Sequence, residues 1–263
     1  MIKIHLVLDS CILLTKVTVD IALPYNLLNI QDKYKVLWCF HCSLEDGRFF
    51  FEKLSLSNYV DSNSLVLIAP SLQNNFFCNS NQSRCEDFIS QELIPILRRT
   101  LPLSVETKDN FLLGFSMGAF GAWNFATKHS HFFSKVALVS GYYDYKLSED
   151  KRFTAKNKEQ RNLYFIHKML LPFINKAFFD DNGDVLIEYD VDHILENYNS
   201  DSNQKFYIYV GSRDFFSYSQ SYNLYKKMKD KLISVDIKES DGVHDIKYWN
   251  DIIETIIEDL VEG

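Results

Sequence analysis

The chain has 263 residues, of which 46% are hydrophobic and 24% charged, and its formal net charge is −7. This composition is typical of globular proteins and excludes collagen-like, disordered and membrane-spanning classes. Nucleic acid is not expected as a partner, because a chain with an acidic excess is poorly suited to neutralising phosphates. The first 14 residues include Lys3, His5 and Asp9 and contain no small-residue cleavage site, so we expect neither a signal peptide nor a membrane anchor. We predict a cytoplasmic protein.

Strand patterns appear in two forms along the chain. Residues 2–8 and 17–23 alternate apolar and polar side chains, which predicts a pair of antiparallel strands. The segments that follow are short, nearly continuous apolar runs, a pattern typical of parallel strands buried on both faces. These runs are residues 34–40, 64–70, 110–115, 134–141, 205–211 and 233–239.

Helical patterns separate these strands, and the alternation predicts a doubly wound α/β fold with helices on both faces of the sheet. Residues 83–99 are expected to form a helix whose Ser83 and Glu86 have the spacing of a capping box. Residues 248–260 are predicted to form a single closing helix. We expect one domain over residues 1–263, in which an insertion at about 142–204 covers the active site.

Five cysteines are present, and Cys39 and Cys42 form a C-x-x-C pair. An odd number of cysteines favours reduced thiols over a disulfide framework. No second pair has the spacing of a metal site, so we predict neither a zinc site nor a redox motif.

One serine lies in the sequence G-x-S-x-G, formed by residues 114–118. This motif requires a strand before it and a helix after it, and both patterns are present. Glycines allow the tight turn that exposes the hydroxyl group of Ser116, because a Cβ atom at either position would collide with the neighbouring chain. The start of the helix then directs N–H groups toward negative charge that develops beside the serine. Ser116 is therefore the candidate nucleophile.

A serine nucleophile needs a general base and an acid that orients the base. Asp214 follows the strand at 205–211, and His244 follows the strand at 233–239. Their order after Ser116 is that of α/β-hydrolases, so we assign His244 as the base and Asp214 as the acid. The alternative carboxylates are Asp241 and Asp245, and the less well placed histidines are His41, His129, His131, His167 and His193.

Four segments together resemble the tributyrin esterase family, the esterase D-like branch of the α/β-hydrolases. They are residues 34–41 (YKVLWCFH), 114–123 (GFSMGAFGAW), 211–216 (GSRDFF) and 241–249 (DGVHDIKYW). The resemblance implies an α/β-hydrolase fold and hydrolysis of short-chain acyl esters through an acyl-enzyme, with no cofactor and no metal. Relatives in this family include hydrolases of formylglutathione, feruloyl and acetylxylan esterases, and mycolyl transferases.

The loop after the third strand departs from the family pattern of His-Gly followed by small residues. This chain has His41-Cys42-Ser43-Leu44 instead. The resemblance implies that the oxyanion of the tetrahedral intermediate is bound by the backbone N–H of Met117 and by a second N–H from this loop. Cys42 and Ser43 both carry such a group. The sequence leaves open which of the two is the donor.

Aromatic residues near the expected site predict an apolar acyl pocket. The candidates are Phe76, Phe77, Phe215, Phe216 and Trp249, of which Phe215 and Trp249 are the predicted substrate contacts. We expect acetyl to butyryl esters, which are small molecules, as substrates. We expect no nucleic-acid or membrane partner. A homo-oligomer is compatible with the sequence. Two alternatives remain: a thioesterase or acyltransferase with the same three residues, and a catalytically silent binding protein of the same fold.

Overall fold

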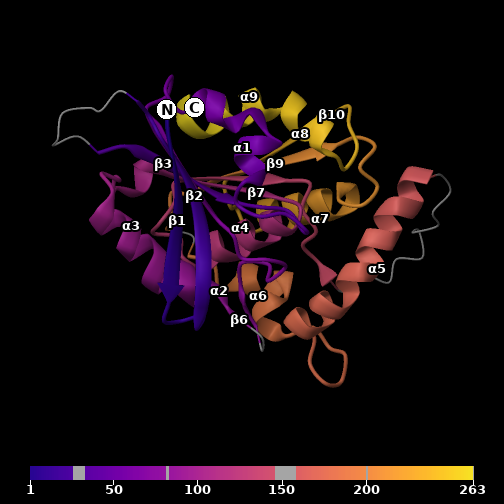
Figure 1. Cartoon of the computed structure of the whole chain (residues 1–263). Coiled ribbons are helices and arrows are strands. Elements are labelled where there is room, and N and C mark those ends of the chain that lie inside the picture. Colours follow the sequence, from indigo (N-terminus) through magenta and orange to yellow (C-terminus); the bar gives the residue numbers. More distant parts are fainter. Residues whose placement is uncertain (26–32, 81–82, 146–157, 200, 263) are drawn as a thin grey trace.

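An eight-stranded sheet lies at the centre of the protein, seen in a computed structural model (Figure 1). The structure describes residues 1–25, 33–80, 83–145, 158–199 and 201–262. The strand order is β1-β2-β4-β3-β7-β8-β9-β10. The bounds are β1 (Ile2–Ser10), β2 (Thr15–Leu23), β3 (Lys35–Phe40), β4 (Leu65–Pro70), β7 (Asn110–Phe115), β8 (Lys135–Val139), β9 (Lys205–Gly211) and β10 (Val235–Ser240).

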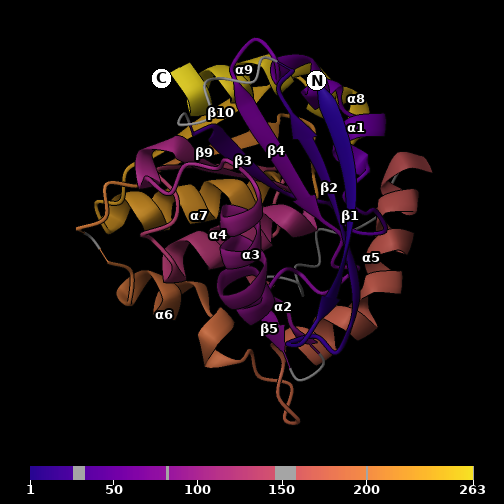
Figure 2. The ribbon, with the colours of Figure 1, turned by 60° about the vertical axis from the view of Figure 1, so that its left-hand side comes forward.

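The two N-terminal strands form the predicted antiparallel hairpin. β1 pairs only with β2 among the described strands, and β2 pairs in turn with β4, also antiparallel. In Figure 2 these three strands lie side by side. Side chains of β1 alternate between exposed and half-buried, because this edge strand is packed on one face. All other neighbours in the sheet are parallel.

Two hydrophobic clusters cover the two faces of the sheet, which explains why the parallel strands are apolar throughout. One face carries α2 (Cys85–Asp87), the π-helical turn η2 (Phe88–Leu93), α3 (Ile94–Thr100), α4 (Met117–Lys128), α6 (Val191–Glu196) and α7 (Tyr218–Asp230). The other face carries α1 (Phe49–Glu52), η1 (Ser55–Tyr59), α8 (Ile246–Asp251), α9 (Ile253–Ile257) and the π-helical turn η6 (Glu258–Glu262). Figure 1 shows these two layers above and below the strands.

The capping box predicted at Ser83 and Glu86 is wrong. Ser83 belongs to β6 (Ser83–Arg84), which pairs with β5 (Asn79–Ser80), and the helix begins only at Cys85. Glu86 is buried, and its carboxylate accepts hydrogen bonds from Lys128 and pairs with the ring of His129. A tertiary contact with α4 therefore uses the side chain that the pattern assigned to a local cap.

The predicted closing helix is divided into parts. Ile252 separates α8 from α9, and η6 continues the chain after α9. Burial nevertheless follows the predicted stripe, since Trp249, Ile253, Ile256 and Leu260 all lie in the core. The amphipathic pattern thus identified the buried face, although it did not reveal the break.

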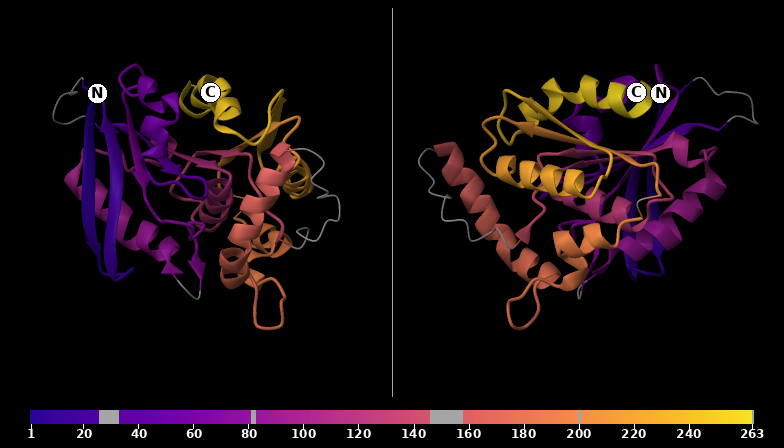
Figure 3. Two further views of the ribbon diagram at one scale, coloured as in Figure 1. Left: turned by 45° about the vertical axis from the view of Figure 1, so that its right-hand side comes forward. Right: turned by 180° about the vertical axis from the view of Figure 1, so that it is seen from behind.

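The predicted insertion contains α5 (Lys158–Phe178), the 3₁₀ turn η5 (Ile187–Tyr189) and α6. Figure 3 shows α5 as the helix that extends farthest from the sheet at one end of the molecule. Residues 146–157 lie outside the described part of the chain. None of the described helices has the length and apolar character needed to cross a membrane. The division into one domain with a covering insertion stays a prediction.

The strand order reverses between β3 and β7. The chain moves from β3 outward to β4, and after the next crossover β7 pairs on the other side of β3. In open α/β sheets, ligands bind beside the carboxyl ends of strands at such a switch point. The segments that follow β3 and β7 are His41–Leu44 and Ser116, which places both at this position.

Candidate active site

Ser116 stands at the turn between β7 and α4 with a φ of 51°. Only glycine fits on either side of it. A Cβ atom at Gly114 would lie 2.1 Å from the carbonyl oxygen of Gly118, and one at Gly118 would lie 2.1 Å from that of Phe40. The turn therefore packs backbone against backbone, and this close approach holds Ser116 in its strained conformation.

Asp214 and His244 lie on two adjacent loops that follow β9 and β10. These loops touch at Gly211, where a Cβ atom would lie 2.5 Å from the carbonyl oxygen of Gly242. The N–H of Arg213 also donates to that oxygen, at 2.9 Å. The parallel pairing of β9 with β10 thus brings the two loops to the same edge of the sheet.

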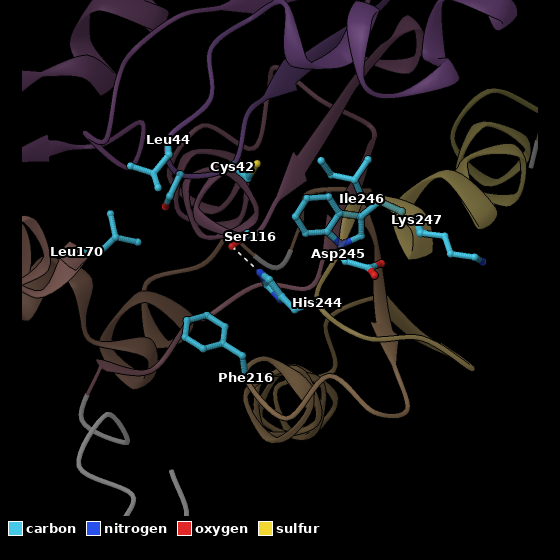
Figure 4. A pocket seen from close by; sticks show the side chains of 11 residues that line it. Cys42, Leu44, Ser116, Leu170, Phe216, His244, Asp245, Ile246 and Lys247 are labelled. Atoms are coloured by element: carbon cyan, nitrogen blue, oxygen red, sulfur yellow. Dashed lines mark hydrogen bonds between the residues drawn. The ribbon is translucent and has the colours of Figure 1, made fainter. Parts of the chain in front are cut away.

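The three candidate side chains form one hydrogen-bonded chain. His244 Nδ1 lies 2.9 Å from Asp214 Oδ2. On the other side of the ring, His244 Nε2 lies 3.0 Å from Ser116 Oγ, the contact drawn in Figure 4. An ionised carboxylate only accepts hydrogen bonds, so Nδ1 carries the proton and donates it to Asp214. Nε2 is then the acceptor for the hydroxyl group of Ser116. This is the arrangement in which histidine can remove a proton from serine.

The carboxylate of Asp214 is fully buried and has several donors. It accepts from the hydroxyl of Ser217 at 2.6 Å and from the backbone N–H groups of Phe216 and Ser217. Burial alone would raise the pKa of Asp214, but the charge of His244 and the hydrogen bonds from His244 and Ser217 outweigh it and lower that pKa. Asp214 is therefore ionised near neutral pH.

A cavity of about 510 Å³ opens beside Ser116. Its lining residues are Cys42, Ser43, Leu44, Ser116, Leu170, Phe216, His244, Asp245, Ile246, Lys247 and Trp249. In Figure 4, Leu44 and Leu170 lie on one side of Ser116, and Ile246 and Lys247 lie on the other. Most of the walls are apolar, which suits the hydrocarbon part of a small molecule.

The predicted substrate contacts are corrected in one position. Trp249 lines the cavity, but the lining aromatic of the loop after β9 is Phe216 and not Phe215. Phe76 and Phe77 are core residues, which pack against Phe120 and Phe40. Sequence reasoning also missed Leu44, Leu170, Ile246 and Lys247, because a cavity wall assembled from three distant segments has no local pattern.

Two amide groups with free N–H bonds lie close to the serine. Met117 is the first residue of α4, and Ser43 lies in the loop after β3 beside the cavity. Within the described part of the chain, the N–H groups of Met117 and Ser43 donate to no protein acceptor. Unpaired N–H groups at a cavity are available to a bound oxygen atom.

The remaining histidines and cysteines of the sequence analysis have other surroundings. His41 is buried behind the loop, His129 pairs with Glu86, and His131 is exposed. His193 lies in the first turn of α6, where its backbone N–H donates to the side chain of Asp190. The side chain of His167 lies outside the described part of the structure. Cys39 and Cys42 are buried free thiols, and burial raises the pKa of the Cys42 thiol well above its ordinary value.

Comparison with known proteins identifies the family. Residues 10–260 match the model of the protein family described as "Putative esterase". The chain belongs to this family. The predicted enzyme class, a serine hydrolase of carboxylic esters, is confirmed at that level, and a small-molecule ester is its kind of substrate. The narrower tributyrin esterase branch stays a prediction, as does the cytoplasmic location.

Individual relatives of this esterase are distant in sequence. An acetyl esterase of Caldicellulosiruptor saccharolyticus is 24% identical over 200 residues, which cover 74% of this chain and 71% of the relative. Two Staphylococcus aureus structures match nearly the whole of both chains. The fluorophosphonate-binding serine hydrolase FphF has 21% identity over 99% of this chain and 98% of its own, with a TM-score of 0.79. The S-formylglutathione hydrolase FrmB has 20% identity over 99% and 98%, with a TM-score of 0.77. The predicted α/β-hydrolase fold is thereby confirmed.

Proposed function

We propose that this protein is a serine esterase that hydrolyses short-chain acyl esters, acetyl to butyryl, with Ser116, His244 and Asp214 as its catalytic triad. The observation that carries the proposal is the hydrogen-bonded chain from Ser116 Oγ through His244 to Asp214, at the edge of an apolar cavity. The resemblance to acetyl esterase supports the short acyl group.

Acylation begins when Ser116 Oγ attacks the ester carbonyl carbon and His244 Nε2 takes the hydroxyl proton. The ionised Asp214 stabilises the imidazolium that forms. The tetrahedral intermediate then expels the alcohol, which receives the proton from His244. A water molecule repeats the sequence on the acyl-serine, His244 again acting as base, and the carboxylic acid leaves.

The carbonyl oxygen gains negative charge in each tetrahedral intermediate. The N–H of Met117 is the first donor to this oxygen, because it stands at the N-terminus of α4 directly after the nucleophile. A loop amide from Cys42 or Ser43 is the second. Each such donor contributes roughly 10²- to 10³-fold to turnover in serine hydrolases.

The apolar walls set a limit on the acyl chain. Each methylene group that fits adds about 0.8 kcal/mol of burial, or about a fourfold gain in kcat/KM. Leu44, Leu170 and Phe216 line a cavity of about 510 Å³, so methylene groups that exceed this space stay in water or push the walls apart. We therefore expect kcat/KM to peak at or below butyrate and to fall steeply by octanoate.

A series of nitrophenyl esters from acetate to palmitate tests the proposal, with the butyryl thioester as a parallel substrate. Ser116→Ala is expected to lower turnover by roughly 10⁶-fold and to leave the fold intact, because the hydroxyl is the attacking group and its loss creates almost no cavity. Circular dichroism provides the control for folding. An optimum at decanoate or longer contradicts the short-chain assignment, and substantial activity in Ser116→Ala contradicts the mechanism.

A further inference from the structure

His41 is a fully buried histidine that the proposed mechanism does not use. It follows β3 directly, and its ring lies between the loop that lines the cavity and the segment after β4. The edge of its ring packs against Phe77, with 4.9 Å between the ring centres. When both nitrogens of a buried imidazole have polar neighbours, these neighbours determine which nitrogen carries the hydrogen.

The two contacts of the His41 ring assign its proton. The backbone N–H of Leu72 donates to Nε2 at 3.2 Å, which requires Nε2 to be the unprotonated nitrogen. Nδ1 therefore carries the hydrogen and donates it to the carbonyl oxygen of Cys42 at 2.9 Å. Burial favours this neutral form and lowers the pKa of His41 to about 4, against weaker upward effects of the Cys42 carbonyl and Asp46.

The bond to Cys42 fixes more than one atom. In a trans peptide the C=O of one residue and the N–H of the next point in opposite directions from one plane, and the described residues contain no cis peptide. When His41 holds the carbonyl oxygen of Cys42 behind the loop, the N–H of Ser43 must point the other way. Ser43 lines the cavity beside Ser116, so that direction is available to a bound oxygen.

The same geometry argues against the N–H of Cys42 as the donor. The carbonyl oxygen of His41 faces the first turn of α4, since it lies 2.6 Å from a Cβ atom placed at Gly118. The N–H of Cys42 shares that peptide plane and points away from α4, which carries the amide of Met117. Only the next N–H of the loop, that of Ser43, remains directed toward the cavity.

Two further hydrogen bonds join this loop and the residues just after it to the segment that follows β4. Leu44 has a φ of 66°, and its N–H donates to Asn74 Oδ1 at 2.9 Å. The N–H of Gly47 donates to Ser71 Oγ, also at 2.9 Å. The N–H donor of Leu72 and the acceptors Asn74 and Ser71 form a support behind the loop. His41 connects this support to the carbonyl oxygen of Cys42 and so determines the orientation of the Cys42–Ser43 peptide.

We propose that His41 is a positioning residue of the oxyanion hole. Its side chain holds the Cys42–Ser43 peptide so that the N–H of Ser43 binds the oxyanion together with the N–H of Met117. The proposal rests on the proposed ester hydrolysis. This loop has no glycine after the histidine. In it, the side chain of His41 orients the N–H donor of Ser43.

The test compares an ester with its thionoester, in which sulfur replaces the carbonyl oxygen. Sulfur accepts hydrogen bonds weakly, so a thionoester benefits little from an oxyanion hole. His41→Gln keeps an acceptor for Leu72 but loses the donor to Cys42, whereas His41→Asn keeps a donor near Nδ1. We expect His41→Gln to lower kcat for nitrophenyl butyrate about 100-fold, to change KM little, and to lower kcat for the thionobutyrate less than threefold. His41→Asn is expected to recover part of the loss.

Two further variants keep the test decisive. Phe77→Leu disturbs packing against the His41 ring without touching the loop and is expected to leave the ratio of ester to thionoester rates unchanged. Ser43→Pro removes the assigned N–H directly and is expected to show the same selective loss as His41→Gln, even where His41→Gln does not fold. Equal losses on both substrates, or an unchanged ratio in Ser43→Pro, would overturn the proposal. A wild-type protein that cleaves neither substrate would instead refute the proposed function.

Discussion

The proposed nucleophile turn, residues 114–118, and the proposed oxyanion loop, residues 41–44, hold strained backbone by different means. Each has a residue with positive φ, Ser116 at 51° and Leu44 at 66°. In the nucleophile turn, two glycines allow backbone to touch backbone. In the oxyanion loop, side chains behind the loop bind its peptide groups instead. One region is specified by missing side chains, and the other by the side chain of His41 within the loop and that of the distant Asn74.

Substitution of the proposed acid, Asp214, is expected to have the largest effect among the predictions that follow. It tests the side-chain hydrogen bonds that hold His244. Asp214→Asn is expected to lower kcat by roughly 10⁴-fold, because an amide cannot stabilise the His244 imidazolium or fix its tautomer. Steady-state hydrolysis of nitrophenyl butyrate measures it. Asp241→Asn is the matched control, since Asp241 is exposed and pairs with Arg213. A larger loss in Asp241→Asn, or in Asp245→Asn, would show that the acid is misassigned.

A methyl group in the nucleophile turn tests the part held by backbone contacts. Gly118→Ala places a Cβ atom 2.1 Å from the carbonyl oxygen of Phe40, so β3 and α4 must separate. We expect a loss of about 3 kcal/mol in the free energy of unfolding and a fall of at least 100-fold in kcat. Urea unfolding and hydrolysis measure the two effects.

Gly183→Ala is the control for that substitution. Gly183 has a φ of 86° and no atom within 4 Å of a Cβ placed there. Gly183→Ala is expected to lower the free energy of unfolding by about 1 kcal/mol through backbone strain alone and to leave kcat unchanged. Similar losses of kcat in the two alanine variants would contradict the close approach as the reason for Gly118.

The same difference explains what the sequence revealed. The motif at Gly114 to Gly118 is local, and Asp214 and His244 each follow a clear strand pattern, so all three positions could be predicted. The support behind the oxyanion loop could not, because Leu72 and Asn74 meet His41 and Leu44 only after β3 and β4 have paired. Phe216 lines the cavity and the adjacent Phe215 does not, and no sequence pattern distinguishes the two.

The two regions also differ in how they respond to pH, and this difference is expected to be smaller than the effects above. The backbone contacts of the nucleophile turn contain no titrating group, whereas His41 is neutral when folded and its pKa is lowered from 6.5 to about 4. Between these values the unfolded chain binds a proton that the folded protein does not, so stability rises with pH across this window. Protonation of His41 in the unfolded chain should therefore lower the free energy of unfolding by about 3 kcal/mol as the pH falls from 6.5 to 4.

Urea unfolding at several pH values checks this expectation. His41→Gln is expected to be less stable at pH 7 and to show a shallower fall in stability between pH 6.5 and 4 than the wild type. Gly183→Ala, which changes no titrating group, is expected to keep the wild-type slope. An equally steep fall in His41→Gln would mean that His41 is not the group that takes up the proton.

The identity of the nucleophile is tested most directly by labelling with a fluorophosphonate, followed by intact mass measurement and peptide mapping. We expect one adduct per chain, located on Ser116, with loss of hydrolysis in proportion to labelling and no adduct in Ser116→Ala. An adduct on another residue, or unlabelled protein that still hydrolyses nitrophenyl butyrate in the presence of excess probe, would contradict Ser116 as the nucleophile.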